Sequence, residues 1–132
     1  MLWKRITYLA KANNTINPQS KNNMNYMVTG ANSGLGLDTA RQLALMPHTK
    51  MVYLACRTEA KALKAIDDIV RIGKAPKSKL TFLYFDASAD KDTIERSILG
   101  SLPSGETING LILNAGGVVS QRHIASIGAQ CL

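Results

Sequence analysis

Cysteine is scarce in this sequence of 132 residues, which contains only Cys56 and Cys131. The two form no Cys-x-x-Cys pair and no zinc-ligand spacing, so the sequence gives no support to a disulfide framework or a metal site. This composition fits a reducing compartment, and Cys56 is most simply a small buried residue at the end of an apolar run. His48 and His123 are isolated and are expected in loops or at the surface.

Long apolar runs are also absent. A membrane helix requires about 20 consecutive apolar residues, and no run in this chain approaches that length. The composition is 45% hydrophobic and 19% charged, which is typical of a soluble globular protein. We therefore expect one domain and no integral membrane segment.

Acidic residues are missing from the beginning of the chain, where the first is Asp38. The basic residues that precede it are Lys4, Arg5, Lys11 and Lys21. This composition predicts a basic, disordered extension over residues 1–23. An organelle transit peptide is the alternative, because Leu2, Ile6 and Leu9 could share one helical face. Localisation therefore stays open between the cytoplasm and an organelle.

The net charge of +7 raises the question of nucleic acid binding. Beyond the first 37 residues the excess is modest and is spread over helix faces and the lysine-rich loop of residues 74–79. Aromatic residues make up only 5% of the chain, and none forms a stacking platform beside these charges. Nucleic acid is therefore not expected as a partner.

The most informative stretch is residues 27–37, in which an apolar run leads into a turn with the spacing Gly-x-x-x-Gly-x-Gly at Gly30, Gly34 and Gly36. Glycine permits a tight turn, close approach of a pyrophosphate to the backbone, and packing of a helix against a strand. The free N–H groups at the start of the following helix favour an anion. The stretch predicts a dinucleotide-binding turn, with a purely structural turn as the alternative.

Strand-like and helix-like segments alternate along the chain. Apolar runs of strand length lie at residues 26–28, 51–55, 80–85 and 108–113. Helical periods lie at residues 37–46 and 58–73 and after a cap at Ser88 or Asp90, the last with a buried stripe of Ile94, Ile98 and Leu99. Because crossovers between parallel strands are right-handed, this alternation predicts an α/β fold with a doubly wound parallel sheet.

The segment Thr29-Gly-Ala-Asn-Ser-Gly-Leu-Gly36 resembles the Thr-Gly-x-x-x-Gly-x-Gly signature of short-chain dehydrogenases/reductases. The resemblance continues through residues 53–57, 85–87 and 113–116 and looks nearest to the retinol dehydrogenase and protochlorophyllide reductase branches. It implies a Rossmann-like half-domain over residues 24–117, truncated to about four strands in the order 3-2-1-4. Residues 118–132 form a tail without clear periodicity.

The resemblance also implies a set of cofactor-binding residues. These are Gly30, Asn32, Ser33, Gly34, Leu35, Gly36, Arg57, Asp86, Asn114, Ala115 and Gly116. Arg57 stands near the position where an acid would accept hydrogen bonds from the adenosine ribose, and its guanidinium suits a 2′-phosphate. NADP(H) is therefore predicted over NAD(H), with an exposed strand-end arginine as the alternative. Asp86 is predicted either to contact adenine or to cap a helix.

One feature of the resembled family is missing, namely a tyrosine followed four residues later by lysine. Residues Ala12, Gly30, Arg57 and Ser88 follow the four tyrosines at that spacing. In the family this pair supports hydride transfer between a carbonyl or alcohol and the nicotinamide. We therefore expect the NADP(H)-binding part of an oxidoreductase, without catalytic residues of its own. A C-terminal half supplied in trans, or a homo-oligomer, is the expected partner. The alternatives are an inactive nucleotide-binding or interaction module and a truncated gene product.

Overall fold

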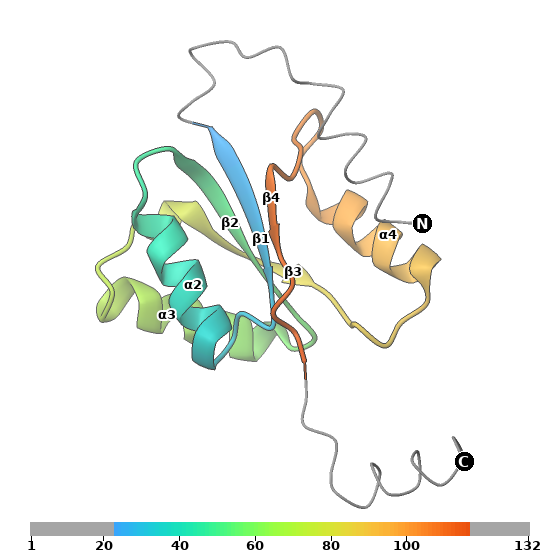
Figure 1. Cartoon of the computed structure of the whole chain (residues 1–132), viewed down its shortest axis with the longest axis horizontal. Coiled ribbons are helices and arrows are strands. Elements are labelled where there is room, and N and C mark those ends of the chain that lie inside the picture. Colours follow the sequence, from blue (N-terminus) through green and yellow to red (C-terminus); the bar gives the residue numbers. More distant parts are fainter. Residues whose placement is uncertain (1–22, 117–132) are drawn as a thin grey trace, which may run out of the picture.

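The computed structural model describes residues 23–116, which form a four-stranded parallel sheet flanked by helices (Figure 1). The strands are β1 (Met24–Thr29), β2 (Thr49–Cys56), β3 (Leu80–Tyr84) and β4 (Gly110–Ile112). The helices are α2 (Gly34–Leu45), α3 (Glu59–Arg71) and α4 (Lys91–Ser101), and a short 3₁₀ turn, η2 (Lys77–Lys79), precedes β3. The strand order is β3-β2-β1-β4, and every neighbouring pair is parallel. The predicted α/β fold and strand order are confirmed.

Several element boundaries differ from the predictions, and two of them differ for reasons that are visible in the backbone. Helix α2 begins at Gly34 rather than at residue 37. The glycine turn ends at Gly34, where φ is +57°, and the chain is helical from there. Strand β4 covers only Gly110–Ile112 rather than residues 108–113, since only these three residues pair with β1. Strand β4 is therefore shorter than the apolar pattern predicted.

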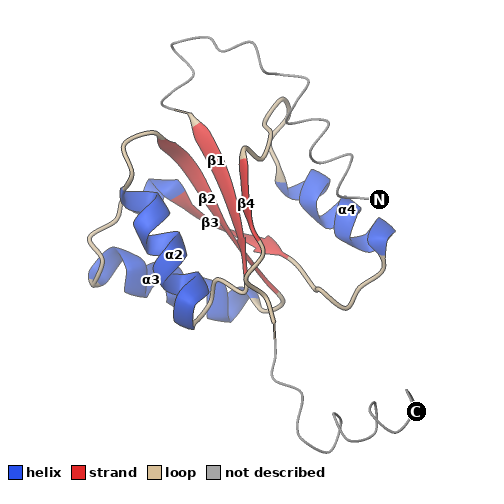
Figure 2. Cartoon of the chain, in the orientation of Figure 1, coloured by secondary structure: helices blue, strands red, loops and turns tan. Residues whose placement is uncertain are grey.

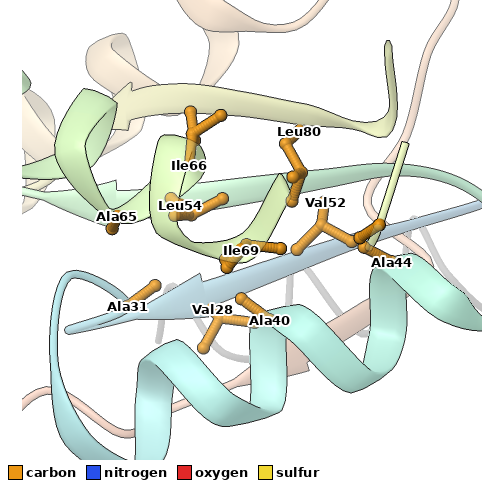
Figure 3. Close-up of a cluster of buried hydrophobic side chains, with 11 residues drawn as sticks. Val28, Ala31, Ala40, Ala44, Val52, Leu54, Ala65, Ile66, Ile69 and Leu80 are labelled. Carbon is orange, nitrogen blue, oxygen red and sulfur yellow. The ribbon is translucent and has the colours of Figure 1, made fainter. Parts of the chain in front are cut away.

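Helices α2 and α3 cover one face of the sheet (Figure 2). Ala40 and Ala44 of α2 lie one turn apart and are fully buried, and their small side chains let the helix approach β1 and β2 closely. Ile66 and Ile69 of α3 fill the space over β2 and β3, beside Leu54 (Figure 3). This face carries the larger hydrophobic core.

Helix α4 covers the opposite face, where the buried cluster consists of Met27, Tyr53, Ala55 and Leu83. No residue of α4 itself is fully buried. The predicted stripe on this helix is wrong at Leu99, whose residue surface is 60% exposed. Ile98 packs on the cluster together with Leu102, and Leu99 lies about 100° further round the helix, so it faces away from the sheet.

Part of the sequence lies outside the described residues. The extension predicted for residues 1–23, apart from its last residue, and the tail predicted for residues 118–132 fall there. Among the helices of residues 23–116, none has both the length and the apolar character needed to cross a membrane.

Candidate functional site

A hollow of about 490 Å³ lies at the carboxyl ends of the parallel strands, lined by the segments that follow each of them. In open parallel sheets this edge is where ligands bind. Eight of the eleven residues predicted to bind a cofactor line this hollow: Gly30, Asn32, Ser33, Arg57, Asp86, Asn114, Ala115 and Gly116. The topology therefore brings together segments that lie more than 80 residues apart in the sequence.

The glycine turn forms the part of the hollow that follows β1. Gly30 and Gly34 have φ angles of +64° and +57°, a left-handed conformation that glycine adopts without strain. A Cβ atom on Gly36 would overlap the carbonyl oxygen of Gly30 and would lie 2.6 Å from Asn114 Nδ2. Gly36 therefore permits the first turn of α2 to lie directly against the end of β1.

Three of the predicted residues, Gly34, Leu35 and Gly36, do not line the hollow itself. They form the first turn of α2, and Leu35 is 80% exposed. The N-cap residue Ser33 makes no side-chain capping bond, and this first turn contains no acidic residue. Within residues 23–116, the first N–H groups of α2 therefore lack a side-chain cap, and such groups suit an anion.

Thr29 supports the lining residues that follow β4, and it was not predicted as a site residue. Its buried hydroxyl accepts hydrogen bonds from the backbone N–H groups of Asn114 (3.0 Å) and Ala115 (2.9 Å). It also donates to the carbonyl oxygen of Ile112 at 3.4 Å, and the Asn114 amide donates to the Gly30 carbonyl oxygen at 3.4 Å. A single threonine thus joins the ends of β1 and β4. Its place as the first residue of the glycine signature was the available signal.

Two cationic side chains lie at the end of β2. Arg57 is exposed, and Lys61, in the first turn of α3, lines the same hollow. Lys61 was not predicted, although its position in the first turn of the helix that follows Arg57 was a usable signal. Cys56, which precedes Arg57, is buried, and burial raises the pKa of its thiol. The Cys56 S–H group donates to the Thr58 carbonyl oxygen at 3.5 Å, so this thiol is a packed neutral group.

Asp86 follows β3 and lines the same hollow as these cations. Of the two predictions for it, the helix cap is wrong. The carboxylate of Asp90 caps α4 by accepting from the Thr93 N–H at 2.9 Å. Asp86 instead accepts from the N–H (2.9 Å) and the hydroxyl (2.7 Å) of Ser88. These hydrogen bonds, and then the charge of Arg57, lower the pKa of Asp86, so it is ionised at neutral pH.

Comparisons with known proteins agree on one family. The family model described as "short chain dehydrogenase" matches residues 25–128. The chain is 37% identical over 90 residues to a WW domain-containing oxidoreductase of Drosophila melanogaster, covering 68% of this chain and 21% of that protein. It is 31% identical over 105 residues to dehydrogenase/reductase SDR family member 12 of Bos taurus, covering 80% of this chain and 31% of that protein.

A solved structure shows the same fold. The short chain dehydrogenase from Salmonella enterica serovar Typhi matches with a TM-score of 0.53 and 22% identity, over 74% of this chain and 39% of that one. The chain spans less than a third of the length of the two curated relatives described above.

Proposed function

Because the chain belongs to the short-chain dehydrogenase family, we propose that residues 24–117 bind NADP(H) as the nucleotide-binding part of an oxidoreductase. The observation that carries this proposal is one hollow that joins the glycine turn to Arg57 and Lys61. The dinucleotide supplies the hydride when it is bound. The residues of this chain bind and orient it.

Each part of the dinucleotide has a matching group in the hollow or directly beside it. The glycine turn and the uncapped first turn of α2 suit the pyrophosphate, because backbone N–H groups are there without a side chain in the way. Asp86 and Ser88 lie where the adenine would be read, and an ionised carboxylate can accept from the adenine amino group. Asn114 to Gly116 present backbone and small side chains to the nicotinamide half.

The preference for NADP(H) over NAD(H) rests on charge at the end of β2. Residues 55–58 are Ala-Cys-Arg-Thr, so the segment offers no carboxylate to the 2′-hydroxyl of NAD. Arg57 provides a planar fork for a phosphate, and Lys61 adds a second positive charge in the same hollow. Both groups favour a 2′-phosphate dianion.

Catalysis requires groups that the described residues do not bring to the hollow. None of the described tyrosines lines the hollow. The Tyr26 hydroxyl is hydrogen-bonded to His48 Nε2 at 3.1 Å, Tyr53 is buried in the sheet and Tyr84 lies on β3. Tyr8 lies outside the described residues. We propose that the proton-donating tyrosine and its lysine come from polypeptide outside this sequence, either in trans or in an oligomer. The 132-residue chain alone is then expected to bind nucleotide without hydride transfer.

A catalytically inactive nucleotide-binding module is the second candidate function, and the same missing tyrosine–lysine pair favours it. The two candidates differ in what an added C-terminal half of a family member would do. Recovery of NADPH oxidation with aldehydes or ketones on mixing supports the enzyme part. Nucleotide binding that stays unproductive after mixing supports the inactive module.

The nucleotide preference is tested by titrating the full chain with NADPH and with NADH. We expect tighter binding of NADPH. Arg57→Glu should weaken NADPH binding by about 10- to 100-fold, because it removes a charged hydrogen bond and adds a repelling charge. NADH binding should change much less. Arg96→Glu is the matched control, since Arg96 is exposed on α4 away from the hollow. Equal affinities of the parent chain for both nucleotides would contradict the preference.

A second variant tests binding of either nucleotide. Gly36→Ala places a methyl group on the Gly30 carbonyl oxygen, so both affinities should fall together. Gly100→Ala is its control, because a Cβ atom there meets nothing within 4 Å. If Gly36→Ala binds both nucleotides as tightly as Gly100→Ala does, the glycine turn is not the pyrophosphate site.

A further inference from the structure

A polar cluster lies at the amino end of β4, at the opposite end of the sheet from the nucleotide hollow. Its centre is Asn25 of β1, which is 2% exposed. The Asn25 side-chain amide donates to Glu106 Oε2 at 2.6 Å and to the Thr107 carbonyl oxygen at 3.0 Å. Lys50 of β2 forms an ion pair with Glu106 Oε1. One carboxylate therefore joins β1, β2 and the segment that leads into β4.

Asn109, the residue before β4, completes this cluster. Its side-chain oxygen accepts from the Asn25 N–H at 2.7 Å, and its own N–H donates to the Asn25 carbonyl oxygen at 2.8 Å. Asn25 Oδ1 is buried and has no hydrogen-bond partner among the described residues. The Asn25 side chain therefore serves as a donor to Glu106 and Thr107 and not as an acceptor. The unpaired buried oxygen is a free-energy cost of this arrangement.

Strand β4 depends on such anchors because its own pairing is short. Only Gly110, Leu111 and Ile112 pair with β1. Gly110 packs directly against the Tyr26 ring, because a Cβ atom on Gly110 would lie only 2.5 Å from Tyr26 Cδ1. At the other end, the Thr29 hydroxyl holds Asn114 and Ala115. Side chains thus fix the strand at both ends. The two anchored residues, Asn109 and Asn114, are about 17 Å apart in an extended chain.

We propose that Glu106 is a positioning residue for the nucleotide hollow, acting through β4. By tying the start of β4 to Asn25 and Lys50, it sets where the end of the same strand places Asn114 and Ala115. The physical reason is that an extended strand transmits a shift along its length, so a displaced amino end carries the carboxyl end with it. The nucleotide part of this inference rests on the proposed function, whereas the positioning part does not.

The chemistry of the cluster gives a graded set of variants. Lys50 and the Asn25 amide lower the pKa of Glu106, so its carboxylate is charged at neutral pH. Glu106→Ala removes both the hydrogen bond from the Asn25 amide and the ion pair with Lys50. Glu106→Gln keeps an oxygen for the Asn25 amide but loses the charge that pairs with Lys50. Asp67→Ala is the matched control, because Asp67 is exposed on α3 and its ion pair with Lys77 (3.8 Å) joins α3 to η2.

The test measures amide hydrogen exchange in the full chain without nucleotide, and then NADPH affinity. In Glu106→Ala we expect the Asn114 and Ala115 amides to exchange at least about tenfold faster, the equivalent of one charged hydrogen bond, while amides of β2 keep their protection. Glu106→Gln should recover part of this protection, and Asp67→Ala should show the parent values. NADPH affinity should fall in the same order.

Two results would overturn the proposal. One is faster exchange that is uniform over β2 and β4, which would make Glu106 a general contributor to stability. The other is unchanged exchange at Asn114 and Ala115. If Glu106→Ala does not fold, Glu106→Gln and Lys50→Met decide between the same outcomes. Since exchange is measured without nucleotide, a parent chain that fails to bind NADPH would contradict the proposed function and leave the exchange test of positioning intact.

Discussion

Eleven buried residues form the hydrophobic cluster under α2 and α3, whereas four form the cluster on the face that α4 covers. The first face is closed by two helices that bring alanines and isoleucines directly onto the sheet. On the second face, α4 contributes only partly buried side chains, such as Ile98. Most of the hydrophobic stabilisation that the described residues provide therefore lies on one side of the sheet.

This difference matters for the candidate site because the glycine turn belongs to the well-packed face. Gly36 and Ala40 hold α2 against β1, so the helix end that is proposed to face the pyrophosphate is rigidly supported. Asp86, in contrast, lies on the connection from β3 to α4, and α4 is the less buried helix. The adenine end of the hollow thus rests on a weaker support than the pyrophosphate end.

The largest expected effect comes from shortening a side chain on each face. Leu54→Ala should lower the free energy of unfolding by about 2–5 kcal/mol, because Leu54 of β2 is fully buried in the larger hydrophobic cluster. Ile98→Ala should cost clearly less, since Ile98 is only partly buried. Urea denaturation of both variants measures the difference. Equal losses would show that the two faces contribute alike.

Helix caps provide a smaller test of the same contrast. Asp90 caps α4 through the Thr93 N–H, whereas the N-cap of α3, Thr58, makes no side-chain capping bond. Asp90→Ala should therefore lower the free energy of unfolding by about 1 kcal/mol, and Thr58→Ala by less. Thermal melts of the two variants provide the measurement. No measurable loss in Asp90→Ala would mean that α4 does not depend on its cap.

The smallest expected effect is at Leu99, which was predicted to be buried and is 60% exposed. Leu99→Lys should change the free energy of unfolding by no more than about 0.5 kcal/mol, as for most surface substitutions. Urea denaturation beside Ile98→Lys, which places a charge against the sheet, gives the comparison. A loss above about 1 kcal/mol for Leu99→Lys would indicate that other polypeptide covers this face of α4.

The sequence by itself determined the local features of this protein. The period of the apolar residues distinguishes strands from helices, and right-handed crossovers then make the strands parallel. The glycine turn at Gly30 and Gly34 was predicted from its spacing, because the conformational freedom of glycine is a property of single residues. The strand order came from the family resemblance of the signature that begins at Thr29. Apart from the strand order, these are properties of short segments.

Only the tertiary structure decided which distant side chains meet. Asn25 and Glu106 are 81 residues apart and hydrogen-bonded, and their meeting depends on the register of β4 against β1, which no local pattern encodes. The same register brings the Thr29 hydroxyl to the Asn114 N–H. The length of β4 was likewise set by pairing, since apolar side chains continue beyond the three residues that find partners on β1.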